Sequence, residues 1–193
     1  SALLNAGMAL VLGLFVFIKQ RRQPAGRAFV ILNAGVFVWA VAYFLWQGSK
    51  DARASLFYCR VITFGSSWIG SAWFHCVMHL LGRWKQMKKW VIASYLIALL
   101  SMLFIGTPLM VNRVEPLLIF SFWPRAGQLY SIYLANFLLP PGIAAYLMFK
   151  DYPHVPQLKK NQIKIMLLAT FVGFLSGASN YPQWYGVNIY PVF

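Results

Sequence analysis

The chain has 193 residues, of which 60% are hydrophobic and 10% charged, so it is too apolar for one water-soluble domain, and an ordinary soluble enzyme is excluded. It carries 17 Lys and Arg residues against 3 Asp and Glu residues. These basic residues lie in short clusters between long apolar runs, which is typical of membrane proteins and not of a nucleic-acid-binding face.

Six apolar stretches are long enough to cross a hydrocarbon core, which takes about 20 helical residues. The sequence therefore predicts an all-α integral membrane protein, a single polytopic helical bundle over residues 1–193. The predicted spans are residues 2–18, 28–46, 56–81, 90–105, 130–149 and 163–178.

The distribution of basic residues predicts the orientation, because Lys and Arg in short loops prefer the cytoplasmic side. The first, third and fifth connections hold twelve of them, and the second and fourth hold four. The odd-numbered connections are therefore expected in the cytoplasm and the N-terminus outside. The last residues, 190–193, read as the approach to a seventh span, so we expect the native polypeptide to be longer.

The fourth connection, residues 106–129, is the longest. A connection of more than about 15 residues is usually functional or disordered, and this one is too apolar for disorder. We expect an ordered hairpin over the outer mouth of the bundle, with Trp123 as a candidate ligand contact. Two interpretations of its aromatic residues stay open: a ligand lid and an aromatic belt at the membrane interface.

Polar residues recur at helical spacing along the third span, from Arg60 to His79, and fall on one side of the helix. Polar groups are costly in hydrocarbon, so this side should face the bundle interior or a watery cavity. Arg60 either snorkels to the interface or binds an anionic or carbonyl group of a ligand. Ser67 and Ser71 are candidate ligand contacts whose simpler role is interhelical hydrogen bonding.

His75 and His79 lie about one helical turn apart, a spacing that suits a metal ion or a haem axial ligand. A metal site usually adds a carboxylate, a thiolate or a further His, which the sequence does not place nearby. Structural histidines are the simpler interpretation, so no metal or cofactor is predicted, and His75 is a candidate ligand contact.

Residue types that are missing from the spans exclude further function classes. The three acids, Asp51, Glu115 and Asp151, all fall in connections, which argues against an ion-driven transporter. No catalytic triad, metal motif or phosphate-binding loop is visible, so no enzymatic activity is predicted for this chain.

Small residues predict where helices approach each other closely. Ser66 with Gly70, and Gly173 with Gly177, form small-xxx-small pairs. Close backbone packing is therefore expected in the third and the sixth span.

Aromatic residues are expected to gather at the outer end of the bundle. A pocket for an apolar molecule combines aromatic walls with a few polar groups that fix orientation, so this end is the candidate mouth of a ligand pocket. The residues expected there are Trp46, Trp123, Tyr130, Trp184 and Tyr185.

Several segments resemble the N-terminal seven-transmembrane sensory region found ahead of bacterial histidine kinases and some diguanylate cyclases. They are RQPAGRAFVILNAGVFVWAVAYFLWQ (22–47), FWPRAGQLY (122–130), GASNYPQWYGVNIYP (177–191), Arg60 with the small residues that follow it, and Phe74-His75 before Leu81-Gly82-Arg83.

The resemblance implies seven spans, a small apolar or amphiphilic signal, and a last helix that passes a conformational change to a dimeric cytoplasmic effector. It marks Arg60, His75, Asn180 and Tyr190 as candidate ligand contacts without assigning their roles. The chain departs from the family pattern because these 193 residues include no effector domain.

We therefore expect a signal-input module in a bacterial inner (cytoplasmic) membrane. Its expected partners are the lipid bilayer, a small apolar ligand, a cytoplasmic effector such as a histidine kinase, and a second copy of the chain; nucleic acid is not among them. One alternative is an accessory structural subunit of a larger membrane complex that holds lipids, pigments or neighbouring helices. Another is a haem or metal carrier based on His75 or His79.

Overall fold

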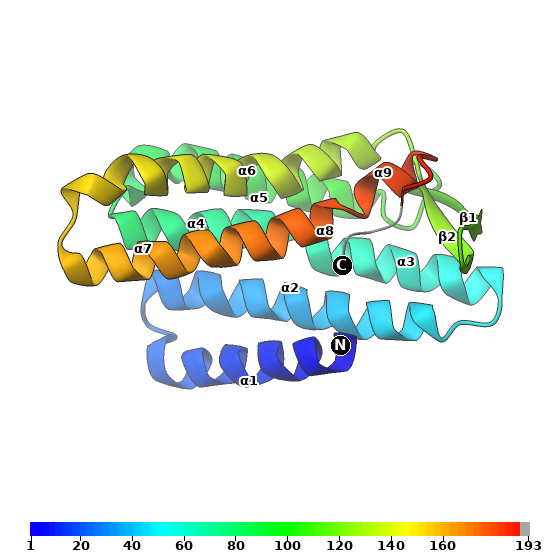
Figure 1. Ribbon diagram of the computed structural model, residues 1–193, viewed down its shortest axis with the longest axis horizontal. Coiled ribbons are helices and arrows are strands. Elements are labelled where there is room, and N and C mark those ends of the chain that lie inside the picture. The colour runs from blue at the N-terminus through cyan, green and yellow to red at the C-terminus, as the bar shows by residue number, and fades with distance from the viewer. Residues whose placement is uncertain (190–193) are drawn as a thin grey trace.

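The computed structural model describes residues 1–189 and shows long helices that run side by side, with a small β-hairpin at one end (Figure 1). The elements are α1 (Ala2–Gln20), α2 (Pro24–Gln47), α3 (Ala52–Ser67), α4 (Ile69–Leu81), α5 (Trp84–Leu103), β1 (Val111–Leu117), β2 (Phe120–Ala126), α6 (Tyr130–Asp151), the 3-10 turn η1 (Tyr152–His154), α7 (Gln157–Thr170), the π-helical segment η2 (Phe171–Leu175), α8 (Ser176–Ala178) and α9 (Tyr181–Trp184). The connections α1–α2, α4–α5 and α6–α7 all lie at the end of the bundle opposite the hairpin (Figure 1).

Within residues 1–189, four helical segments are long and apolar enough to cross a membrane, which makes the chain a multi-pass membrane protein. Three of the remaining helices, α3, α4 and α5, are not membrane spans by this measure, for reasons of length or charge. Taken one at a time, α3 and α4 have only 16 and 13 residues and are too short. α5 is long enough, but three lysines in its first two turns lower its mean hydropathy. The four segments are Ala2–Gln20, Pro24–Gln47, Tyr130–His154 and Gln157–Trp184.

The predicted third span is divided into two helices, α3 and α4, which meet at Trp68. The hydroxyls of Ser66 and Ser67 donate to the carbonyls of Ile62 and Thr63, four residues back, at 2.7 Å each. Such bonds compete with the backbone ladder and often bend helices. The two serines therefore give a local reason for the break, which hydropathy alone does not reveal.

The predicted hairpin in the fourth connection is confirmed, and it corrects the all-α prediction by adding a two-stranded antiparallel sheet. The register pairs Leu117 with Phe120. Leu118, in the two-residue turn between them, has a φ of 53°. The hairpin lies beside the end of α3 that begins at Ala52 (Figure 1).

Two apolar clusters form the core. One lies mainly on α4, α6 and α7 and includes Phe74, Met78 and Met148. The other lies at the hairpin end and includes Trp46 and Tyr130. The two clusters therefore tie the hairpin to the same bundle that forms the membrane-spanning helices.

Glycines allow the closest helix contacts. A Cβ on Gly65 of α3 would lie 2.9 Å from the carbonyl oxygen of Gly35 in α2, and one on Gly70 of α4 would lie 2.8 Å from the carbonyl oxygen of Phe137 in α6. A Cβ on Gly173 or Gly177 would meet nothing within 4 Å. The close packing predicted for the third span is therefore confirmed at Gly70, and that for the sixth span is wrong within the described residues.

Candidate functional site

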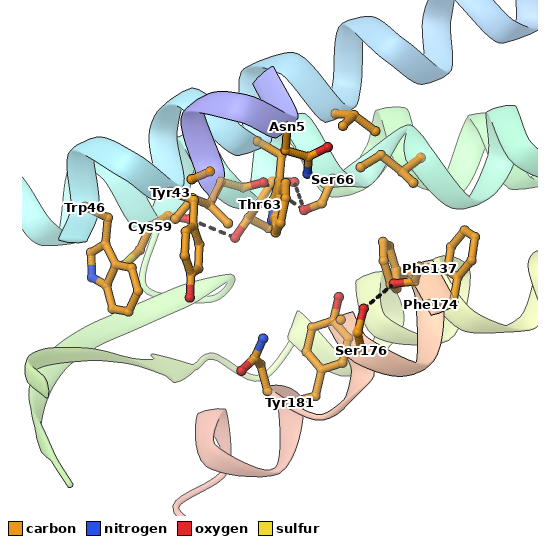
Figure 2. A pocket seen from close by; sticks show the side chains of 18 of the residues that line it. Asn5, Tyr43, Trp46, Cys59, Thr63, Ser66, Phe137, Phe174, Ser176 and Tyr181 are labelled. Atoms are coloured by element: carbon orange, nitrogen blue, oxygen red, sulfur yellow. Dashed lines mark hydrogen bonds between the residues drawn. The ribbon is translucent and has the colours of Figure 1, made fainter. Parts of the chain in front are cut away.

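A cavity of about 820 Å³ runs along the bundle between α2 and α3 on one side and the segment from η2 to α9 on the other, where Phe137 of α6 lies beside Phe174 (Figure 2). Its volume falls in the usual range of small-molecule sites, about 300–1,000 Å³. The residues that line it include Asn5, Phe29, Leu32, Asn33, Trp39, Tyr43, Trp46, Ile62, Thr63, Ser66, Trp73, Phe120, Trp123, Tyr130, Tyr133, Phe137, Phe174, Ser176, Asn180, Tyr181 and Trp184.

Aromatic rings form the wall at the hairpin end. Trp46 stacks on Phe120 at 5.8 Å and meets Trp123 edge-on at 5.4 Å between ring centroids. The Trp46 indole nitrogen donates to the carbonyl of Phe122 at 3.0 Å. These contacts attach the hairpin to α2 through packing and a hydrogen bond together, so the hairpin closes the cavity at this end.

A second aromatic stack comes from α6 and α9. Tyr130 is fully buried and its ring stacks on Trp184 at 4.4 Å. The structure thus brings together four of the five aromatic residues that the sequence places at the mouth. Tyr185 lies 6.2 Å from the Tyr130 ring, but it is 51% exposed and does not line the cavity.

Three hydroxyls form a chain across the cavity wall. The Ser66 hydroxyl donates to the carbonyl of Ile62, which can only accept. Ser66 therefore accepts from Tyr133 at 2.7 Å, and Tyr133 in turn accepts from Tyr181 at 3.4 Å. The direction of this chain leaves the Tyr181 oxygen as a hydrogen-bond acceptor beside the cavity.

No Lys, Arg, Asp or Glu side chain among residues 1–189 lines this cavity. Polar character comes instead from amides and hydroxyls such as those of Asn5, Tyr43, Thr63 and Ser176, which face the space from both sides (Figure 2). A buried charge without a partner costs far more free energy than a buried neutral group. The cavity is therefore suited to an uncharged molecule.

The structure divides the candidate site residues into two groups. Trp123 and Asn180 line the cavity, whereas Arg60, Ser67, Ser71 and His75 do not. Tyr190 lies outside the described residues.

Each residue of the second group makes a contact elsewhere in the bundle. Arg60 is half-buried, and its Nη2 donates to the carbonyl of Val111 in the hairpin at 3.5 Å. The Ser71 hydroxyl accepts from the Asn136 amide at 3.4 Å, so it joins α4 to α6. The Ser71 bond is the interhelical hydrogen bond expected in the simpler role of the two serines, whereas Ser67 donates to the Thr63 carbonyl of its own helix, α3.

Sequence reasoning missed several cavity residues, above all Tyr133, Tyr181, Phe137 and Phe174. Tyr133, Phe137 and Phe174 lie in apolar segments, and Tyr181 begins α9; which side of each element faces the cavity depends on how α6, η2 and α9 pack. The one available signal was a Tyr hydroxyl within an apolar run, because a buried Tyr usually has a hydrogen-bond partner.

An ionic network links the hairpin to the C-terminal segment. Glu115 accepts from Arg113 Nε at 2.7 Å and from Arg125 Nε at 2.5 Å. Arg125 also donates to the carbonyl of Gln183 in α9 at 2.8 Å. The two arginines, Arg113 first, hold the pKa of the Glu115 carboxyl below its usual value.

The two histidines of α4 lie away from the cavity. Their Nε2 atoms are 3.2 Å apart, and both rings stack on Trp84 of α5. Within the described part of the chain, no group of three or more His, Cys, Asp or Glu residues is placed to hold a metal ion.

Comparison with known proteins agrees with this architecture of apolar helices. The family described as the N-terminal 7TM region of histidine kinase matches residues 2–193. No curated protein and no solved structure matches the chain. Since the match extends over nearly the whole sequence, the chain belongs to the family of N-terminal 7TM regions of histidine kinases.

Proposed function

We propose that this region is the signal-input module of a histidine kinase and that it binds a small, uncharged, apolar or amphiphilic ligand in the cavity behind the hairpin. The observation that carries the proposal is the 820 Å³ aromatic cavity without a charged lining side chain. Trp123 and Asn180, which line it, contact the ligand directly. The region itself carries out no catalysis.

The proposal includes six spans in this chain: α1, α2, α3 with α4, α5, α6, and α7 through α8. Basic residues support the orientation, because they cluster in the three connections at the end opposite the hairpin (Figure 1). That end lies in the cytoplasm, where the effector is, and the hairpin and N-terminus lie outside. The membrane is the inner membrane of a bacterium, and the module acts as a homodimer.

A ligand signals only if it binds two arrangements of the protein with different affinity. Two walls of the cavity can transmit such a difference. The hairpin contributes Trp123, and the C-terminal segment contributes Asn180 and Tyr181. Arg125 joins these walls through the Gln183 carbonyl, so a ligand that draws one wall inward also moves the other.

The test uses the purified full-length kinase and three probes of matched shape: decylbenzene, decanophenone and 4-decylbenzoate. The two uncharged probes are expected to stabilise the protein, and the anion is not. At a ligand concentration of 100 Kd the gain is about 2.7 kcal/mol, which is a rise in Tm of about 5–11 °C for a domain of this size.

A matched pair of variants ties any binding to the cavity. Gly177 lines the cavity, and the space around its α-carbon is open, so Gly177→Phe fills part of the ligand volume. Gly142 has equal space but lies off the cavity, so Gly142→Phe should leave binding unchanged. Equal loss in both variants, or preferential binding of the anion, would refute the proposal.

The accessory-subunit alternative predicts a different result. No probe then shifts Tm, and the chain is isolated from its native membrane in a fixed ratio with a larger complex instead of as part of a kinase. Finding such a complex would replace the sensory proposal.

A further inference from the structure

The pair of histidines on α4 is a feature that the proposed sensory function does not use. His75 and His79 lie outside the cavity lining, near the end of the bundle where α4 leads into α5. Both side chains are partly exposed, so neither is sealed inside the packed core. Trp84 and Tyr95 of α5 complete the cluster.

The distance between the two imidazoles fits a chelate. A metal–nitrogen bond of about 2.0–2.1 Å and a ligand angle between a right angle and the tetrahedral value put two coordinating nitrogens about 2.8–3.4 Å apart. The Nε2 atoms of His75 and His79 are 3.2 Å apart. Both can therefore coordinate one ion with little movement.

The neighbours of His75 prepare its Nε2 to act as a ligand. Metal-binding histidines usually donate their second ring N–H to an oxygen, which fixes the tautomer. Nδ1 of His75 lies 3.3 Å from the Tyr95 hydroxyl. With the proton on Nδ1 donated to this oxygen, Nε2 presents its lone pair toward His79.

Stacking restricts both rings. Trp84 lies 4.8 Å from each imidazole between centroids, at interplanar angles of 23° for His75 and 19° for His79. Less conformational entropy is then lost when an ion joins the two nitrogens. The cluster is thus preorganised by a residue of the neighbouring helix.

Positive charge near the pair is partly neutralised. Arg83, four residues after His79, donates through Nε and Nη2 to the two carboxylate oxygens of Asp151, at 2.6 Å each. This bidentate pair directs the guanidinium charge toward α6.

We propose that His75 and His79 bind one divalent late first-row transition-metal ion, Cu²⁺, Ni²⁺ or Zn²⁺, as a two-nitrogen chelate whose other positions are filled by water. Imidazole ligands suit these ions, and Cu²⁺ binds most tightly in the usual affinity order. Because α4 supplies the ligands and α5 supplies the groups that orient them, the ion fixes the contact between these two helices.

The direct test is titration of the purified, metal-free full chain, made without a polyhistidine tag, with Cu²⁺ alone. Calorimetry gives stoichiometry and affinity, and electron paramagnetic resonance reports the nitrogen ligands. We expect one ion per chain with two imidazole nitrogens. His79→Ala should weaken binding at least about tenfold, and Tyr95→Phe, which removes only the orienting oxygen, about 10- to 100-fold.

His154 is the matched control because it is the third histidine of the chain and is exposed in η1. His154→Ala should bind Cu²⁺ as tightly as the parent. Unchanged binding in His79→Ala, loss in His154→Ala, or a spectrum with fewer than two nitrogens would overturn the proposal. The metal-free Tm of each variant separates lost binding from lost folding, and His79→Gln replaces His79→Ala if the latter does not fold.

Discussion

The contact between α4 and α6 gives a prediction whose size follows from the structure. In Gly70→Ala the new Cβ would lie 2.8 Å from the Phe137 carbonyl oxygen and 2.9 Å from that of Asn136. An unstrained carbon–oxygen contact is about 3.3 Å or longer. Both opposing atoms belong to the backbone, so no side-chain rotation relieves the clash, and the two helices must separate by about 0.5 Å.

The expected cost is that of overpacking, about 1–3 kcal/mol. Alanine also gains up to about 1 kcal/mol of helix propensity over glycine, so a single variant would understate the clash. Gly142→Ala corrects for this, because Gly142 lies in α6 and a Cβ there meets nothing within 4 Å. The difference between the two variants should be about 1–3 kcal/mol, or about 2–12 °C in Tm for this chain length.

The assay is thermal unfolding of both variants in the same detergent, followed by circular dichroism. Gly70→Ala should melt below the parent or close to it, and Gly142→Ala at or above the parent. If the two variants melt at the same temperature, α4 and α6 do not approach as closely as the structure shows, and the reasoning from the Gly70 contact fails.

Two further predictions concern the polar groups of the site. Tyr133→Phe removes the middle hydroxyl of the hydrogen-bonded series Ser66–Tyr133–Tyr181. In a chemical-denaturation measurement it should lower the free energy of unfolding by about 0.5–1.5 kcal/mol. Tyr146→Phe is the control, because the Tyr146 side chain is 64% exposed and its loss of a hydroxyl should leave the free energy of unfolding unchanged. Glu115 has a folded-state pKa below its ordinary 4.5 because of Arg113 and Arg125, so its stabilising contribution is present above pH 4.5 and is lost as the pH falls through the folded-state value. Melting curves from about pH 6 to pH 3 should therefore show a smaller acid-induced drop in Tm for Glu115→Gln than for the parent; identical drops would mean that this carboxylate does not contribute.

Much of the architecture follows from local properties of the sequence. Apolar runs indicated the helices, and the composition of residues 106–129 predicted an ordered hairpin. The break at Trp68 was not predicted, because hydropathy averages over Ser66 and Ser67 and does not show that their hydroxyls bond to the preceding turn. The spacing of small residues predicted close helix packing equally at the pair containing Gly70 and at the pair containing Gly173. Of these two glycines, Gly70 lies against the backbone of another helix and Gly173 does not.

The candidate site was predictable in its chemistry and less so in its membership. Aromatic density at one end of the bundle indicated a cavity wall, and Trp123 and Asn180 do line the cavity. Helical periodicity placed the polar face of the third span toward the interior, but Ser67 and Ser71 use their hydroxyls within the packed helices. Tyr133 and Tyr181 are 48 residues apart in sequence, and only tertiary packing brings them together.

The walls of the cavity differ in how firmly they are held, and this difference indicates which of them can move. On one side, α3 meets α2 at Gly65, where a Cβ would clash with the α2 backbone, so this contact has little freedom. On the other side, η2 and α8 contain no buried residue, and Gly173 and Gly177 leave open space. A π-helical segment is itself common at functional sites. A ligand that fills the cavity would therefore act mainly on η2 and α8, where few buried contacts oppose a shift, whereas the stack of Trp184 on Tyr130 holds α9 in place.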